Sequence, residues 1–184
     1  MDFENIEKKI LAYQAEGKKL FTSSSFQSHS IVLLHILSRI DKNIPVYFIN
    51  TGYHFPETIT YRDKITDLFG LNLVDKKPTT PKSLQKDASG KLMFTSDPDY
   101  CCHLNKVLPM DEALAEHDIW INGVRGDQSA VRKAMLVEQP APHDTLRFHP
   151  MLDWTSKMIY DYQKEFNLPK HELESQGYLS IGCE

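Results

Sequence analysis

The segment KLFTSSSFQSHSIVLLHILSRIDKNIPVYFIN, residues 19–50, contains the pattern from which the fold is predicted. Its first part, KLFTSS, is a short apolar run that is typical of a strand and leads into a serine-rich loop. Residues 31–40 form a strongly apolar run of helical length, and residues 44–50 are β-branched and aromatic, as in a buried strand. The segment therefore predicts strand, helix and strand in succession.

The same alternation continues along the chain. Residues 76–100 are rich in proline and are expected to form a long functional loop. Helices are predicted at 3–16, 56–69, 104–117, 128–135 and 155–166, the last opened by Thr155, and extended segments at 71–75, 118–124 and 146–152.

This order predicts an α/β fold, a single-domain parallel sheet with flanking helices on both faces. Such sheets bind ligands beyond the carboxyl ends of their strands, so the loops after strands are the candidate sites. No repeat or linker divides the sequence, and we expect one domain over residues 1–184.

Composition limits the class of protein. The chain has 184 residues with 41% hydrophobic and 25% charged residues, which are ordinary values for a soluble globular domain. No apolar run is long enough to span a membrane, and the amino terminus does not have the pattern of a secretory signal. We expect a cytoplasmic protein whose thiols are reduced. A net charge of −4 with dispersed bases argues against nucleic acid as a partner, whereas a local pocket for a small anion stays open.

The first candidate site is TSSSFQSHS, residues 22–30, between the first strand and the apolar helix. Serine hydroxyls and free backbone N–H groups at a helix start favour an anion. The loop lacks the glycines and the Gly-Lys-Ser/Thr ending of a Walker loop, and an ordinary helix cap with solvated serines explains the same residues. His29 and His35 are expected to belong to the packing or surface of the helix.

Two further loops follow predicted strands. INTGYHFPET, residues 49–58, has Thr51 and Gly52 for a close backbone approach and Tyr53 to flank a base, although a simple turn into a helix explains it equally well. WINGVRGDQSAVRKAM, residues 120–135, offers Arg125, Arg132 and neutral donors that suit phosphate or sulfate oxygens, with a solvated basic turn as the alternative.

The three cysteines form the fourth candidate. Cys101 and Cys102 are adjacent, which disfavours a disulfide between them, and Lys106 lies one helical turn after Cys102. Cys183 follows 80 residues later in GYLSIGCE. Three thiolates do not fit zinc-finger spacing, and a four-thiolate iron–sulfur cluster needs one more ligand, so buried inert thiols remain an alternative.

Taken in order, these segments resemble the sulfonucleotide reductases, the family of adenosine phosphosulfate (APS) and phosphoadenosine phosphosulfate (PAPS) reductases. The similar segments are the serine loop, TGYHFPET, CCHLNKVLPMDEAL, GVRGDQSAVR and GYLSIGCE, so the match covers nearly the whole chain. The resemblance implies an adenine nucleotide alpha-hydrolase-like fold. The substrate-binding residues that it implies are Ser23, Ser24, Ser25, Phe26, Gln27, Ser30, Thr51, Gly52, Tyr53, Gly123, Arg125, Gln128, Ser129 and Arg132.

The resemblance also implies a reaction: reduction of APS, or PAPS, to sulfite and AMP, or PAP, in sulfate assimilation. A cysteine thiolate attacks sulfur to form an enzyme thiosulfonate, and thioredoxin supplies the electrons. Cys101, Cys102 and Cys183 match three ligands of a [4Fe-4S] cluster, and Lys106 matches a lysine between cluster and substrate. The fourth ligand and the nucleophilic cysteine are expected beyond Glu184, which would make this chain a truncated form.

Two positions depart from the family pattern. Asn50 stands where the family has aspartate, and Gly126 stands where it has a second arginine. Two other functions remain as alternatives: an adenylating ATP pyrophosphatase, although the Ser-Gly-Gly-x-Asp-Ser loop of that class is missing, and a nucleotide-binding scaffold without catalysis.

Overall fold

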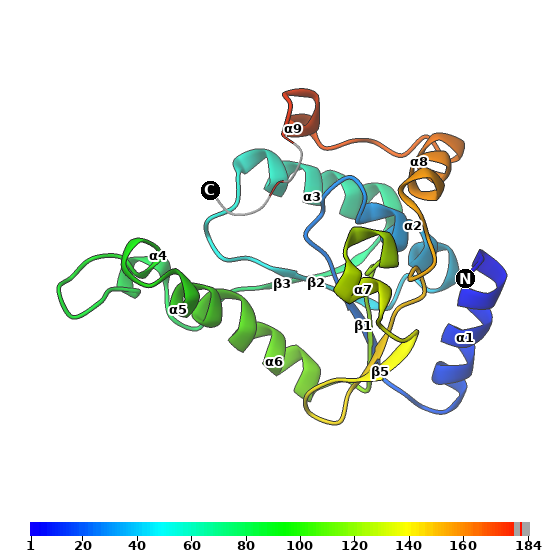
Figure 1. The fold of residues 1–184 in the computed structure, drawn as a ribbon, viewed down its shortest axis with the longest axis horizontal. Coiled ribbons are helices and arrows are strands. Elements are labelled where there is room, and N and C mark those ends of the chain that lie inside the picture. The colour runs from blue at the N-terminus through cyan, green and yellow to red at the C-terminus, as the bar shows by residue number, and fades with distance from the viewer. Residues whose placement is uncertain (179–180, 182–184) are drawn as a thin grey trace.

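The computed structural model describes residues 1–178 and residue 181. The described residues contain a six-stranded sheet with the order β3-β2-β1-β4-β6-β5 (Figure 1). The first five strands in that order are parallel, and β5 is antiparallel to β6. The strands are β1 (Leu20–Ser23), β2 (Pro45–Ile49), β3 (Asn72–Lys76), β4 (Ile119–Ile121), β5 (Glu138–Pro140) and β6 (Leu146–Phe148).

The strand order places a topological switch point between β1 and β4. The chain runs outward from β1 to β3 and then returns to the opposite side of β1 with β4. Loops that leave β1 and β4 therefore diverge to form a crevice at the carboxyl edge of the sheet. The serine loop follows β1 and the arginine loop follows β4, so these two predicted sites meet there.

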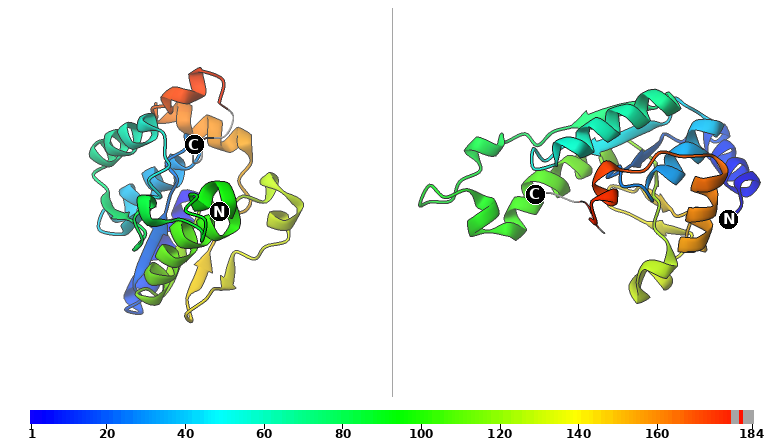
Figure 2. Two further views of the ribbon diagram at one scale, coloured as in Figure 1. Left: turned by 90° about the vertical axis from the view of Figure 1, so that its left-hand side faces the viewer. Right: turned by 90° about the horizontal axis from the view of Figure 1, so that it is seen from above.

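Helices cover both faces of the sheet, as predicted, but unequally (Figure 2). Side chains of four helices join the larger core on one face, and α6 (Leu108–Ala115) packs on the other. Alternate strand residues divide between the two cores: Val46 and Phe48 join the larger one, and Tyr47 joins the smaller one. The four helices are α1 (Phe3–Ala15), α2 (Ile31–Ile40), α3 (Pro56–Phe69) and α8 (Ser156–Glu165).

Helix ends follow ordinary capping chemistry. The Asp2 side chain accepts a hydrogen bond from Asn5 N at 2.9 Å at the start of α1. The predicted cap of α8 is confirmed, because Thr155 Oγ1 accepts from Met158 N at 3.2 Å. Gly70 ends α3 with a φ of 65°, a left-handed conformation that glycine adopts without a steric penalty.

Three elements differ from the predictions. The polar edge strand β5 was not predicted, because Glu138, Gln139 and Pro140 show no apolar alternation. The short helix α9 (Glu172–Ser175) was also missed. Residues 76–100 are more ordered than a loop, since they contain η1 (Lys82–Leu84), α4 (Met93–Ser96) and the start of α5 (Pro98–Cys102).

The helix that carries the cysteines is interrupted. After α5, residues His103–Val107 form a π-helical turn, η2, that continues into α6. We call residues 82–107 the arm, because this segment extends away from the sheet (Figure 1). Single π-helical turns are rare and are frequent at functional sites. Among the described residues, no helix is long and apolar enough to cross a membrane.

Buried His171 fixes α9 to the body of the domain. Its backbone N donates to Ser28 Oγ at 2.8 Å, and its Nδ1 accepts from Leu173 N at 3.2 Å. Because Nδ1 is an acceptor, Nε2 carries the proton and donates to Thr58 Oγ1 at 3.0 Å. Burial lowers the pKa of His171, and burial likewise lowers the pKa of His35 and His149.

These neutral histidines predict a pH-dependent stability. Below about pH 6.5 the histidines of the unfolded chain bind protons, whereas the buried histidines of the folded chain stay neutral. The free energy of unfolding therefore decreases as the pH decreases. We expect unfolding in urea to need less denaturant at pH 5.5 than at pH 7.5. His171→Gln should reduce this difference, whereas exposed His103→Gln should preserve it. Equal stability at the two pH values would contradict the assignment.

Candidate functional site

Two cavities flank the serine loop at the carboxyl edge of the sheet. The anion pocket, about 280 Å³, is lined by Ser23, Ser24, Ser25, His29, Ser30, Leu33, Leu34, Gly123, Val124, Arg125, Gln128, Arg132, Met151 and Ile159. The apolar pocket, about 630 Å³, is lined by Ser23, Ser24, Ser25, Gln27, Phe48, Ile49, His54, Lys106, Val107, Met110, Asp111, Leu114, Trp120, Pro142, Arg147 and Ile181. Three serines belong to both walls, so a ligand lying across the loop can occupy both cavities.

The serine loop is held in a fixed shape by its neighbours. Ser24 N donates to Tyr47 O at 3.1 Å, and Ser24 Oγ accepts from Phe26 N at 3.1 Å. Trp120 Nε1 donates to Ser23 Oγ at 3.0 Å, which ties the loop to β4. The Ser23 hydroxyl proton remains available to a ligand, because that oxygen is the acceptor in this bond.

Phe26 has a structural role in this loop. Its side chain is fully buried, lines neither cavity and packs on Phe48 with ring centroids 5.8 Å apart. Its φ of 55° is left-handed, which costs a non-glycine residue about 1–2 kcal/mol. The Phe26 side chain therefore acts as a core anchor that turns the loop, and contact of Phe26 with the substrate stays a prediction.

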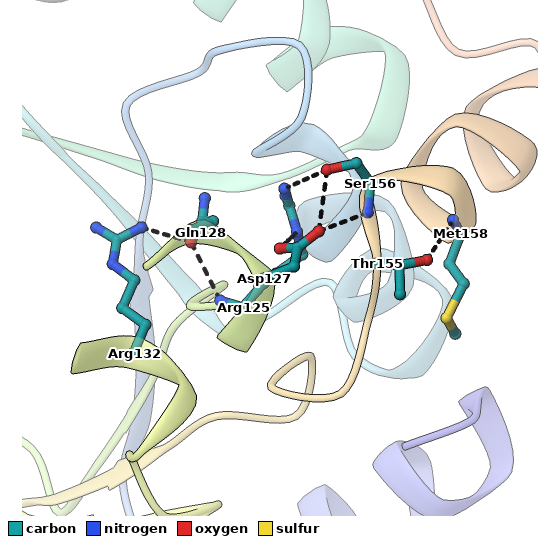
Figure 3. A network of polar contacts seen from close by, with 7 residues as sticks. All are labelled: Arg125, Asp127, Gln128, Arg132, Thr155, Ser156 and Met158. Atoms are coloured by element: carbon teal, nitrogen blue, oxygen red, sulfur yellow. Dashed lines mark hydrogen bonds and ion pairs between the residues drawn. The ribbon is translucent and has the colours of Figure 1, made fainter. Parts of the chain in front are cut away.

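Arg125 and Arg132 enter the anion pocket from the loop after β4 and from α7 (Ala130–Lys133) (Figure 3). Arg125 is 7% exposed, and its Nε donates to Asp127 Oδ1 at 3.1 Å. Gln128 Oε1 accepts both from Arg125 N, at 3.2 Å, and from Arg132 Nη1. Gln128 therefore sets the position of both arginines.

Ser129 positions Arg132 and lines neither cavity. Its hydroxyl accepts from Arg132 N at 3.2 Å and caps α7. Behind the arginines, Asp127 Oδ2 accepts from Ser156 N at 2.7 Å and from Ser156 Oγ at 3.0 Å (Figure 3). Burial raises the pKa of Asp127, but hydrogen bonds from Ser156 and the charge of Arg125 outweigh it, so the pKa lies below its ordinary value.

Thr51, Gly52 and Tyr53, in the loop after β2, line neither of the two cavities. Gly52 has a φ of 78°, and its carbonyl oxygen accepts from Lys82 Nζ at 3.3 Å. The same ammonium group lies 3.9 Å from the centroid of the Tyr53 ring, and Thr51 Oγ1 accepts from Tyr53 N at 3.2 Å. These contacts bind the arm to the sheet, and contact of Thr51, Gly52 and Tyr53 with a nucleotide stays a prediction.

His54, in the same loop, lines the apolar pocket. Its Nε2 lies 3.0 Å from Ile49 O. Burial lowers the pKa of His54 although that hydrogen bond acts in the opposite direction. The ring is therefore uncharged and forms part of the pocket wall.

Lys106 lies on the π-helical turn and lines the apolar pocket from the arm. Cys101 is half-buried, Cys102 is exposed, and both thiols are free. Asn105 Nδ2 donates to Cys101 O at 2.8 Å and lies 3.5 Å from Cys101 Sγ. Cys183 lies outside the described residues, within which no group of three or more His, Cys, Asp and Glu side chains is placed to hold a metal ion.

A buried pair of amides fixes the cysteine helix to the rest of the arm. Gln85 Nε2 donates to Asn105 Oδ1 at 2.9 Å, and Asn105 Nδ2 donates to Gln85 Oε1 at 2.6 Å. Both side chains are almost completely buried. The pair was not predicted, because Gln85 and Asn105 are 20 residues apart and no local pattern links them.

Comparison with known proteins agrees with this geometry. A family model described as "Phosphoadenosine phosphosulfate reductase domain" matches residues 19–184. The chain belongs to this family. An adenosine 5'-phosphosulfate reductase of Bacillus velezensis is 35% identical over 175 residues, which cover 94% of this chain and 75% of that protein.

Solved structures confirm the reductase-family fold. A phosphoadenylyl-sulfate reductase of Candida auris, in a phosphate complex, has a TM-score of 0.78 and 24% identity over 98% of this chain and 93% of that one. A Candida glabrata FMN adenylyltransferase has a TM-score of 0.64 and 15% identity over 90% of this chain and 55% of the other. At these identities the likeness shows the fold alone.

The structure explains both departures from the reductase pattern. Asn50 Oδ1 accepts from Gly52 N at 3.2 Å, while its Nδ2 donates to Asp75 Oδ2 at 3.3 Å. An aspartate at position 50 would place two carboxylates together. Gly126 N donates to Leu152 O at 2.8 Å, and a Cβ at position 126 would lie 3.1 Å from that oxygen, so any side chain there requires the loop to shift.

Loss of the amide pair should lower the stability of the protein and loosen the cysteine helix. Gln85→Ala leaves Asn105 unsatisfied in a buried place, and we expect a loss of about 1–3 kcal/mol in the free energy of unfolding. Alkylation of Cys101, followed by peptide mapping, should become faster relative to exposed Cys102. Ser83→Ala on the exposed side of the same segment is the control. A Gln85→Ala protein with unchanged stability and Cys101 reactivity would show that the pair does not hold the helix.

Proposed function

We propose that the protein reduces adenylyl sulfate (APS), or its 3′-phosphorylated form, to sulfite and AMP, or PAP, in sulfate assimilation and cysteine biosynthesis. The observation that carries this proposal is the serine loop shared by two cavities, one lined by arginines and one mainly apolar and large enough for a nucleoside. The relatives named adenosine 5'-phosphosulfate reductase support the same chemistry.

The serine loop and the arginines bind the charged part of the substrate. Ser23, Ser24 and Ser25, at the end of β1 and in the loop after it, offer hydroxyl donors. Ser30 lines the same pocket and precedes α2, where orphan N–H groups favour negative charge. Arg125 and Arg132 add charge-assisted hydrogen bonds. The nucleoside lies in the apolar pocket, where Phe48, Ile49 and Met110 exclude water from it.

Lys106 provides the positive charge on the opposite wall. It lines the apolar pocket, which shares the three serines with the anion pocket, so its ammonium group can reach a phosphosulfate that lies across the serine loop. A positive charge beside the sulfo group withdraws electron density from sulfur and stabilises the charge that develops during attack.

The reaction requires two thiol steps. A cysteine thiolate attacks sulfur, the bond between sulfur and the bridging oxygen breaks, and AMP leaves with that oxygen. A second thiolate then attacks the cysteine sulfur of the thiosulfonate, which releases sulfite and leaves a disulfide, so the two electrons come from a dithiol such as reduced thioredoxin. No described residue that lines either cavity is a cysteine, so the attacking thiol must reach the serine loop from elsewhere in the protein.

The cysteine helix suits a [4Fe-4S] cluster in its chemistry. Cys101 and Cys102 are unpaired thiols at an accessible helix end, and the Asn105 amide lies within reach of Cys101 Sγ, as suits a thiolate ligand. Cys101, Cys102 and Cys183 would hold the cluster, with a fourth ligand from elsewhere. When bound, it would supply thiolate-ligated iron whose negative charge Lys106 balances.

The test is an assay of the full-length protein, purified anaerobically, with adenylyl sulfate and reduced thioredoxin. We expect sulfite and AMP in equal amounts, a faster reaction with one of the two sulfonucleotides, and bound iron and sulfide. Absence of sulfite from either sulfonucleotide would overturn the proposed activity, and activity without iron would overturn the cluster alone.

A further inference from the structure

His29 lines the anion pocket but has no part in the function proposed above. It comes just before Ser30, the residue that precedes α2, and it shares the pocket wall with Arg125 and Arg132. His29 also lines a smaller cavity, about 200 Å³, together with Gln163 and Glu174. Two arginines and one carboxylate therefore share a cavity wall with His29.

The charged groups around His29 come from three elements. Arg125 follows β4 and Arg132 lies on α7, and both oppose a charge on the ring; Glu174 on α9 favours one. No side chain among the described residues makes a hydrogen bond to the ring. Partial burial of the ring is the largest cause that holds the pKa of His29 below its ordinary value, and the charge of Arg125 is the next. The free protein therefore carries a neutral imidazole near pH 7.

We propose that His29 is a third cationic donor of the anion pocket, and that it takes up a proton when a phosphosulfate binds. This inference rests on the proposed function, since it requires that the pocket receive the charged part of a sulfonucleotide. Negative charge within about 4–6 Å favours the protonated imidazole and offsets the two arginines. A protonated ring also offers N–H donors on both nitrogens.

Proton uptake has a defined consequence for affinity. Between the pKa of His29 in the free protein and its higher pKa in the complex, binding adds up to one proton. Affinity therefore falls as the pH rises through this range, by at most about tenfold per pH unit. Below the range His29 is already charged, and above it His29 stays neutral in both states.

Adenylyl sulfate is the correct probe. A phosphate monoester such as AMP has a second pKa near 6 and would add its own proton linkage, whereas the phosphosulfate anhydride has no such group. Calorimetric titrations in pairs of buffers with different ionisation enthalpies count the protons taken up. We expect a net uptake of protons at pH 7, and an affinity that is higher at pH 6 than at pH 8.

Three variants separate His29 from other groups. His29→Gln should still bind at pH 8 but give the same enthalpy in both buffers. Glu174→Gln should move the uptake to lower pH, because it removes the charge that favours protonation. His143→Gln, a half-exposed histidine outside the anion pocket, is the control and should retain the wild-type uptake.

The outcomes distinguish this inference from the function on which it rests. Saturable binding by the wild type with the same proton uptake in His29→Gln overturns the role of His29 alone. No binding by the wild type at any pH contradicts the proposed function as well. If His29→Gln does not fold, as judged by circular dichroism, an unshifted uptake in Glu174→Gln overturns the inference.

Discussion

Arg125→Ala is expected to weaken the binding of adenylyl sulfate by roughly a hundredfold. Charge-assisted hydrogen bonds contribute about 1.5–3 kcal/mol each, and every 1.4 kcal/mol is about a factor of ten in affinity. The variant also leaves the Asp127 carboxylate, which now accepts from Arg125 Nε, without its charge partner beside the anion pocket. Repulsion between this carboxylate and the ligand adds to the loss.

Calorimetry with matched variants checks this result. Lys133→Ala removes a positive charge from the neighbouring helix α7, but Lys133 lines a different cavity, and binding should change by less than about threefold. Arg125→Lys keeps the charge and loses the fixed fork of donors, so its affinity should be intermediate. Equal affinity of Arg125→Ala and the wild type would remove Arg125 from the site.

Lys106→Met is expected to lower the rate of sulfite formation by about a hundredfold while AMP affinity stays nearly constant. The lysine acts on the sulfo group and on charge that develops at sulfur, and the loss of one such group typically costs about 10²–10³ in rate. AMP has no sulfo group, so its affinity should be nearly the same for the variant and the wild type.

Stopped assays of sulfite, together with AMP titrations of the same protein, measure both quantities. Lys86→Met, an exposed lysine on the same arm, is the control. A Lys106→Met protein that loses AMP binding and sulfite formation to the same extent would assign Lys106 to nucleotide binding and contradict its role at sulfur.

The sheet and the meeting of the two loops were predictable from the sequence. Each of the five parallel strands shows its own local pattern, and once β1 and β4 are adjacent, the serine loop and the arginine loop must share one crevice. Arg125, Arg132 and Gln128 could therefore be assigned to the site from their position after a strand.

Other features depend on contacts between distant residues and leave no local pattern. Phe26 has the same neighbours in sequence as the serines, yet only its packing on Phe48 shows that it belongs to the core. His29 meets Arg125 and Arg132 about 100 residues away in the chain, so its place in the pocket is visible only in the fold. The amide pair of Gln85 and Asn105 is of the same kind.

Determination of the structure with bound adenylyl sulfate tests the central claim most directly. We predict the nucleoside in the apolar pocket and the phosphosulfate across Ser23, Ser24 and Ser25, with Arg125 on one side and Lys106 on the other. A ligand bound away from the serine loop, for example in the cavity beside Met1 and Trp154, would contradict the account.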